Sequence, residues 1–343
     1  MDLTLRPASL SEDGKELAAL LERNTPGPAK EHAYWRHESN PAGPGWSWVI
    51  CDRKSGMISA MASVLPRRVH VNGEIVVCGV VGDFVVDAAI RSLGPAVTLQ
   101  RATFEPVDSG ALAFCYDAVP HDRGMSTFVR LGMSPSCEVI RHACPLRSDD
   151  YLGRRLGKGL WMKPVFAVTN LALRMRTGRR AMSGLEVLEL DDSFGEEFTE
   201  LDKRVSSLGV IRSGRSATDL TWRYRSTPGR RFRILVARGA GELRGFLAFL
   251  VSDNRASIMD LFGVHLSEVS GNLLEALIDL GRREGLAGIE GYLSEDSCLN
   301  TVFARTGFRP RERAARIVAY TKPANSILNS GARWSFGGCD ITQ

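Results

Sequence analysis

The sequence has 343 residues, of which 44% are hydrophobic and 24% are charged, and its formal net charge is +5. A chain of this length exceeds one typical domain, and this composition excludes wholesale disorder, a collagen-like fibre and a coiled-coil rod. The mild positive charge, carried mostly by arginine, favours small anionic ligands such as phosphates and falls well short of a nucleic-acid-binding signature.

Localisation follows from what the sequence lacks. No apolar run reaches the roughly 18 residues that a spanning helix needs. Residues 1–4 lack the basic-then-apolar order of a secretory signal. The seven cysteines are scattered without CxxC pairing. We therefore expect reduced thiols, a cytoplasmic protein and no metal site.

In the first half, strand and helix patterns alternate along the chain. The segment 3–7 alternates like an edge strand, and Ser11 caps a helix that runs to about residue 23. The apolar, β-branched segment 74–86 is typical of a central strand. Further strands are predicted over 46–51, 56–65 and 111–116, and further helices over 95–104 and 125–131.

The second half repeats these patterns. Strands are predicted over 185–190, 232–237, 245–251, 257–264 and 289–293, and helices over 194–204 and 271–283. This arrangement predicts an α+β fold.

Two short motifs recur in the same order in both halves. Residues 34–41 and 221–228 share Trp, Arg, Ser and Pro at an offset of 187, and residues 128–135 and 303–310 share Phe, Arg, Gly and Pro at an offset of 175. A duplicated domain explains both matches. We expect one domain over 1–146, a basic connecting segment over 147–183, a second domain over 184–324 and a tail over 325–343.

The connecting segment contains many basic residues, and 151–182 contains no acidic ones. One interpretation is a connecting helix whose apolar side packs on a domain while its cations stay solvated. The other is an interfacial helix that makes weak peripheral contact with anionic lipid.

The segment around Arg91 has the features of an anion site. A buried strand ends near Val86, and Arg91, Gly94 and Ala96 lead into a helix. Free backbone N–H groups at a helix start attract negative charge, glycine permits close approach, and arginine suits phosphate. Pro95 is tolerated in the first turn but removes one N–H.

This order resembles the pyrophosphate loop of the GNAT superfamily of N-acetyltransferases, Gln/Arg-x-x-Gly-x-Gly/Ala. Phe128 to Met133 fits a later pattern of the same family, so the chain resembles a tandem GNAT protein with two mixed, mostly antiparallel twisted sheets flanked by helices. The resemblance implies acetyl-CoA as co-substrate. It also implies the following cofactor-binding residues: Val85, Val86, Arg91, Ser92, Leu93, Gly94, Ala96 and Phe128.

The second half departs from the family pattern. Residues 264–272 have no Arg-x-x-Gly-x-Gly/Ala loop, so we expect this copy to be a structural or substrate-binding partner. Phe128 and Phe303 stand where the family commonly has an acid tyrosine. The usual general acid is therefore missing from both halves.

Several residues are candidates for catalysis. Asp83 lies in the apolar strand before Arg91, where burial could raise the pKa of a base, and an Asp bonded to a neighbouring strand is the alternative. Tyr116, Asp117 and His121 follow the next strand, where the family's sheet opens, and His121 is a second candidate base.

The acceptor pocket has candidates of its own. Trp35 and Arg36, repeated as Trp222 and Arg223, could supply a flat face and a carboxylate or phosphate clamp, although repeated tryptophans more often anchor a helix to the core. Asp260 stands in a context similar to that of Asp83 and is a further candidate for substrate binding.

We therefore expect an acyltransferase that moves an acyl group, most simply acetyl, from CoA to an amine by direct attack with a general base. The acceptor would be a small molecule, a sugar or a peptide amine. Two alternatives remain: a Fem-type transferase that uses aminoacyl-tRNA, and a catalytically inactive CoA-binding scaffold.

Overall fold

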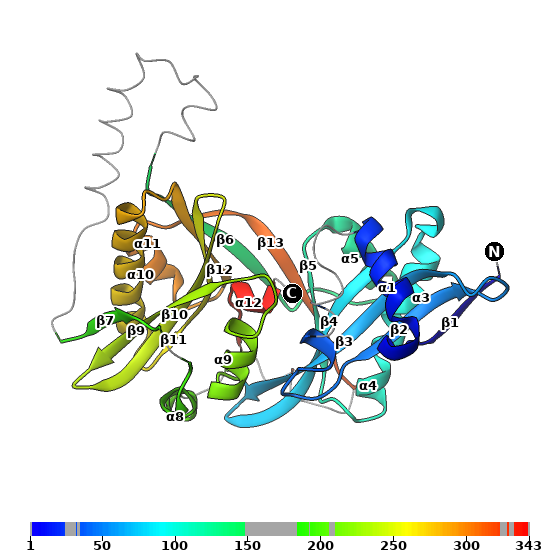
Figure 1. The fold of residues 1–343 in the computed structure, drawn as a ribbon, viewed down its shortest axis with the longest axis horizontal. Coiled ribbons are helices and arrows are strands. Elements are labelled where there is room, and N and C mark those ends of the chain that lie inside the picture. Colours follow the sequence, from blue (N-terminus) through cyan, green and yellow to red (C-terminus); the bar gives the residue numbers. More distant parts are fainter. Residues whose placement is uncertain are drawn as a thin grey trace, which may run out of the picture.

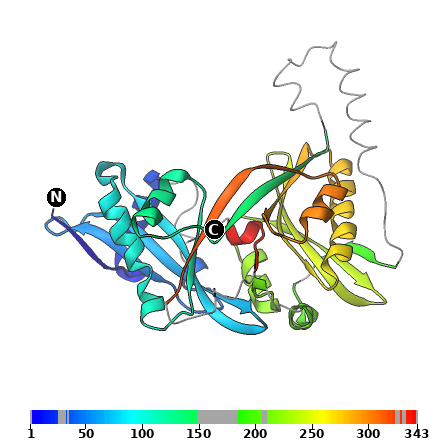
Figure 2. The same ribbon diagram turned by 180° about the vertical axis from the view of Figure 1, so that it is seen from behind.

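The computed structural model describes residues 2–24, 32, 35–147, 184–191, 193–205, 210–322, 328 and 333–341. Two lobes lie side by side, with strands running through both and helices on the sheet faces (Figures 1 and 2). The predicted basic segment over 151–182 lies outside the described residues. In the part that is described, no helix is both long and apolar enough to cross a bilayer.

The first half supplies six strands and four helices with a 3₁₀ turn among its described residues. The strands are β1 (Leu3–Pro7), β2 (Trp46–Asp52), β3 (Ile58–Val71), β4 (Glu74–Val86), β5 (Cys115–Val119) and β6 (Cys137–Pro145). The helical elements are α1 (Leu10–Asn24), η1 (Ala88–Ile90), α3 (Leu93–Ala102), α4 (Glu105–Asp108) and α5 (Asp122–Arg130).

The second half follows a similar order. Its strands are β7 (Glu186–Glu189), β8 (Val210–Ser213), β9 (Phe232–Gly239), β10 (Glu242–Ser252), β11 (Arg255–Gly263), β12 (Gly288–Ser294) and β13 (Arg309–Tyr320). Its helices are α8 (Glu196–Arg204), α9 (Ala217–Tyr224), α10 (Leu266–Arg283) and α11 (Asn300–Arg305). The C-terminal end adds β14 (Arg333–Ser335) and α12 (Gly338–Ile341).

Within the described residues, all fourteen strands belong to one sheet. Its main path runs β1-β2-β3-β4-β5-β13-β6-β12-β11-β10-β9-β7, while β8 joins β3 to β14. Counted inward from the two ends of this path, the strands form pairs of repeat counterparts: β1 with β7, β2 with β9, β3 with β10, β4 with β11 and β5 with β12. An approximate twofold axis therefore passes between the central pair, β13 and β6. The order agrees with the duplication that the repeated motifs predict.

The two halves exchange their last strands. β13, from the end of the second half, lies between β5 and β6, where Ile317 pairs with Ala118 on one side and Cys137 on the other. In return, β6 pairs along its length with β12 of the second half, as Leu293 does with Ile140. The sheet is therefore continuous across the centre of the molecule (Figure 1).

Alternating side chains of each strand face different helices. In β2, Val49 packs toward α1 while Trp48 and Ile50 pack toward α3 and α4. In the second half, one sheet face packs against α10 and α11 and the other against α8 and α9. A separate core joins the halves and is lined by β3, β5, β13 and the C-terminal residues Trp334 and Phe336.

The predicted fold class, a mixed and mostly antiparallel sheet with flanking helices, is confirmed. β1 is an edge strand and β4 a central one, as their residue patterns predicted. Strands β6, β8, β13 and β14 were not predicted, and α10 begins at Leu266 rather than at 271. The domain boundaries proposed above stay a prediction.

Candidate active site

The pairing between β4 and β5 stops partway along these two parallel strands. The last pair joins Val80 to Tyr116. β4 nevertheless continues to Val86 and β5 to Val119. We call the opening between residues 81–86 and 117–119 the first splay. Its strand edges carry backbone groups that a bound extended ligand could pair with.

A cavity of about 610 Å³ lies at the mouth of the first splay. Its walls come from the end of β4 and from the starts of α3 and α5. It brings together many of the residues that the sequence singled out: Val85, Val86, Arg91, Ser92, Leu93, Ala96 and His121. Gly94 and Phe128 are not among its lining residues. Phe128, on α5, is buried against Val119 and Met125.

The start of α3 gives this cavity an anion-binding end. Ser92 is the N-cap and makes no side-chain cap hydrogen bond, so the amides of Leu93 and Gly94 have no intrahelical acceptor. A Cβ placed on Gly94 would meet nothing within 4 Å, which leaves open space over these amides. Among the described residues, the guanidinium of Arg91 donates to the neutral oxygens of Val86 (3.2 Å) and Asn24 (3.2 Å) and to no carboxylate.

A second cation stands beside Arg91. Arg123, in the first turn of α5, also lines the cavity, and neither guanidinium has an ion pair within the described ranges. Two uncompensated cations and two free amides together favour a ligand with more than one negative charge, as in a diphosphate.

Asp83 lies at a bulge in β4, inside the first splay. The register against β3 shifts here, and Asp83 has a φ of 49°. Its buried carboxylate accepts from Arg36 at 2.8 Å and from His37 at 3.1 Å. Burial alone would raise the pKa of this carboxyl, but Arg36 and His37 outweigh it and hold the pKa below its usual range. A carboxylate so paired is a weak base.

Tyr116 stands on the opposite strand of the splay. Its hydroxyl accepts a hydrogen bond from Arg67 at 2.9 Å, and the same nitrogen of Arg67 donates to Asp340 at 2.8 Å. Burial raises the pKa of Tyr116 well above its usual value, so the hydroxyl stays protonated. Its ring packs against Trp334 and Phe336 in the core between the halves, so Tyr116 does not line the cavity and cannot take a proton from an amine there.

Asp117 is the carboxyl in this site best suited to accept a proton. It alternates in phase with Cys115 and Val119, which face α3 and α5. It has no ion pair among the described side chains, and burial raises its pKa to about 7. The sequence placed Asp117 beside the opening but gave it no role, because a raised pKa depends on neighbours distant in the chain.

His121 lies at the outer end of the same opening. It is the N-cap residue of α5, is exposed and lines the cavity mouth. His121 follows the end of β5, four residues after Asp117. Asp117 therefore lies at the inner part of the opening and His121 at its outer part.

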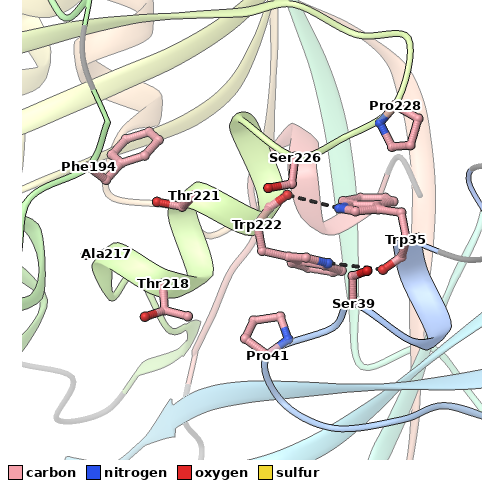
Figure 3. A pocket seen from close by; sticks show the side chains of 10 residues that line it. All are labelled: Trp35, Ser39, Pro41, Phe194, Ala217, Thr218, Thr221, Trp222, Ser226 and Pro228. Atoms are coloured by element: carbon pink, nitrogen blue, oxygen red, sulfur yellow. Dashed lines mark hydrogen bonds between the residues drawn. The ribbon is translucent and has the colours of Figure 1, made fainter.

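The repeated Trp motifs meet at the centre of the molecule. Trp35 and Trp222 stack with ring centroids 4.6 Å apart. Each indole N–H donates to the other residue's carbonyl, at 3.0 and 3.2 Å (Figure 3). They line an open groove of about 1010 Å³ together with the repeat pairs Ser39 and Ser226, and Pro41 and Pro228. The approximate twofold axis therefore passes through this contact.

Asp260 is the counterpart of Asp83 in the second half. It lies three residues beyond the last β11–β12 pair, as Asp83 lies beyond the last β4–β5 pair. Its carboxylate is fully buried, accepts from Arg215 at 2.8 Å and accepts from the Tyr224 hydroxyl at 3.3 Å. The carboxylate thus serves a buried ion pair and lines no described cavity.

The C-terminal residues occupy the second half's own opening between β11 and β12. A Cβ on Gly338 would lie 2.6 Å from the carbonyl oxygen of Ile258 and 3.4 Å from the ring of Tyr292. A Cβ on Gly337 would lie 3.0 Å from the carbonyl oxygen of Met259. Only glycine permits this approach. A cavity of about 440 Å³ also lies at the end of β11 and the start of α10, but the inner part of the second opening is packed with C-terminal residues, a difference that the sequence did not predict.

Known proteins resemble this chain in structure rather than in sequence. No family model and no curated protein matches the sequence. The chain has the GNAT fold, as many solved structures with the same architecture show. A protein from Enterococcus faecalis V583, described as a probable N-acyltransferase, aligns with a TM-score of 0.64 at 10% identity over 94% of this chain and 72% of its own.

Two further structures agree. N-myristoyltransferase from Saccharomyces cerevisiae with bound myristoyl-CoA aligns with a TM-score of 0.60 at 14% identity, over 94% of this chain and 79% of its own. A GCN5-related N-acetyltransferase from Anabaena variabilis ATCC 29413 aligns with a TM-score of 0.64 at 12% identity, over 92% and 72%. These neighbours are acyltransferases, and at such identities they establish the fold.

Proposed function

We propose that this protein transfers an acyl group from an acyl-CoA thioester to an amine, and that the first splay holds the thioester. The observation that carries the proposal is the mouth of the first splay, where two free amides at the start of α3 and two arginines without a described ion pair line one cavity. The second half has a smaller cavity of about 440 Å³ at the end of β11, and its C-terminal residues pack between β11 and β12. Acetyl-CoA is the simplest donor, and the transfer needs no metal ion.

Different residues of the first splay bind the coenzyme and accept the proton. The amides of Leu93 and Gly94, with Arg91, hold the diphosphate, and the free edge of β4 pairs with the pantetheine arm. Asp117 takes the proton of the attacking amine, with a pKa near the operating pH. Asp83 and Tyr116 hold the two walls through Arg36 and Arg67. The CoA thiolate leaves without an acid because its pKa is low enough near neutral pH.

Gly94→Trp tests the coenzyme site without disturbing the fold, because its Cβ points into open space. Isothermal titration with acetyl-CoA should show at least a tenfold loss of affinity in Gly94→Trp and in Arg91→Ala. Gly195→Trp, at the start of α8, is the matched control, since its Cβ also meets nothing within 4 Å. Equal affinity in Gly94→Trp and wild type would overturn the assignment.

Transfer itself is measured as release of CoA thiol from acetyl-CoA and longer acyl-CoAs in the presence of amines. Coenzyme binding without thiol release across the panel would favour a scaffold and refute the transferase. The aminoacyl-tRNA alternative drew on the basic segment over 151–182. No described observation favours it.

A further inference from the structure

Four arginines are buried in the described core, and one of them has no carboxylate. Arg67 pairs with Asp340, Arg212 with Asp202 and Arg215 with Asp260. The fourth, Arg223, is 7% exposed and forms no ion pair with a described residue. Its single described hydrogen bond runs to the Sγ atom of Cys339 at 3.8 Å, and its Nε has no partner.

The approximate twofold symmetry explains how Arg223 came to be unpaired. Its counterpart in the first half, Arg36, pairs with Asp83. The counterpart of Asp83 is Asp260, but Arg215 holds that carboxylate through both Nε and Nη2. The carboxylate that symmetry would give to Arg223 is therefore already occupied. Asp340 and Asp260 interact electrostatically with Arg223 but form no ion pair with it. Donor groups of a buried guanidinium that lack an acceptor in contact are costly, so an anion from outside the chain would be favoured here.

Arg223 faces a small cavity at the junction of the halves. The cavity has a volume of about 40 Å³, and Arg36, Arg67 and Trp222 also line it. A water-sized atom needs roughly 10–15 Å³ of such volume. The space therefore holds only a few such atoms, so it suits a small planar group such as a carboxylate better than a tetrahedral phosphate.

The cavity also borders the site of acyl transfer. Arg36 holds Asp83 on β4, and Arg67 holds Tyr116 on β5, so the cavity lies behind the side chains that fix both walls of the first splay. Trp35 and Trp222 separate it from the larger central groove and line both spaces. Arg36 and Arg67 therefore connect this cavity to both strands of the first splay.

We propose that Arg223 binds a carboxylate of the acceptor, so that the acceptor is an amine that also carries a carboxylate group. This proposal rests on the proposed acyl transfer for its role, but the anion site can be measured separately. Arg223 would fix the acceptor at its charged end and leave the amine free to reach the thioester.

Acetate is the first probe, because it is the smallest carboxylate with a methyl group and needs no turnover. Isothermal titration in chloride-free buffer should show acetate binding to wild type and at least a tenfold loss in Arg223→Met. Arg223→Lys, which keeps the charge, should retain part of the binding. Phosphate should bind at least tenfold more weakly than acetate. Arg91→Ala should lose acetyl-CoA and keep acetate, while Arg223→Met should do the reverse.

A pair of amines tests the role in transfer. Wild type should use 4-aminobutyrate at least tenfold more efficiently, in kcat/KM, than 4-aminobutyramide, and Arg223→Met should remove that preference mainly through KM. Equal acetate binding in wild type and Arg223→Met, or no acetate binding by a wild type that binds acetyl-CoA, would overturn the proposal. If wild type does not bind acetyl-CoA, the proposed coenzyme site is refuted instead.

Discussion

Replacing Asp117 with asparagine should stabilise the protein, and the gain should depend on pH. The pKa of Asp117 in the fold is about 7, against 3.8 for an unperturbed aspartate. The folded protein therefore favours the protonated acid. Between these two values the folded state binds more protons than the unfolded state, so stability falls as pH rises from about 4 to about 7. Asparagine does not ionise and escapes this loss.

The size of the effect follows from the shift. A shift of about 3 units corresponds to a ceiling of about 4 kcal/mol, at about 1.4 kcal/mol per unit. Asp117 keeps part of its surface open to solvent, so we expect about 2 kcal/mol. Urea unfolding of wild type and Asp117→Asn should differ by this amount at pH 8.5 and by less than half of it at pH 5.

Asp13 provides a control of the opposite sign. Arg6 pairs with it at 2.7 Å and lowers its pKa, so its stabilising effect is fully present above about pH 4. Asp13→Asn should therefore destabilise the protein by the same amount throughout pH 5 to 8.5. A stability difference for Asp117→Asn that is flat over this range, or that favours wild type at pH 8.5, would refute the reasoning.

The same substitution tests catalysis. If Asp117 is the base, kcat/KM for transfer by wild type should rise with pH and show an inflection near pH 7. Asp117→Asn should lower kcat/KM by about 10²-fold or more and should remove this inflection. His121→Gln, at the outer end of the site, should leave the inflection in place. The reverse pattern would assign the proton transfer to His121.

Two structural predictions concern the centre of the molecule. Gly338→Ala should lower the free energy of unfolding in urea by about 1–3 kcal/mol, because its Cβ would lie 2.6 Å from the Ile258 carbonyl oxygen. The control Gly14→Ala, in α1 where a Cβ meets nothing within 4 Å, should raise it by about 0.5–1 kcal/mol. Equal effects would argue against the close packing of the C-terminal residues on β11. Trp35→Ala and Trp222→Ala should each destabilise, and a double-mutant cycle should give a coupling of about 1 kcal/mol for the stacked rings. Strict additivity would argue against the contact.

The turn that we propose as the coenzyme site could be recognised from sequence because it lies within a short segment. A strand that ends near Val86, an arginine, and a glycine before a helix are consecutive, and their backbone geometry needs no distant partner. The repeated Trp motif likewise predicted a relation between the halves. It did not predict that Trp35 and Trp222 touch, since a repeat specifies similarity and not contact.

The exchange of strands and the buried charges were decided by tertiary structure. Which strand lies beside β5 depends on pairing across the whole chain, and β13 fits there only because the duplicated halves present matching edges. Arg67 reaches a partner 273 residues away in Asp340. Burial and partner choice set the pKa of Asp83 low and that of Asp117 high, although both are aspartates on apolar strands.

The amino-acid sequence by itself determined helices α1, α3, α5, α8 and α10, most strands, the doubled plan and the strand-to-helix turn at Arg91. Each of these depends on spacing and on backbone conformation over a few residues. Only the tertiary structure decided where the C-terminal residues pack, which buried arginine has no ion pair among the described residues and which carboxyl has a raised pKa. Those properties come from the desolvation and charge that residues far apart in the chain impose on one another once the sheet has closed around them.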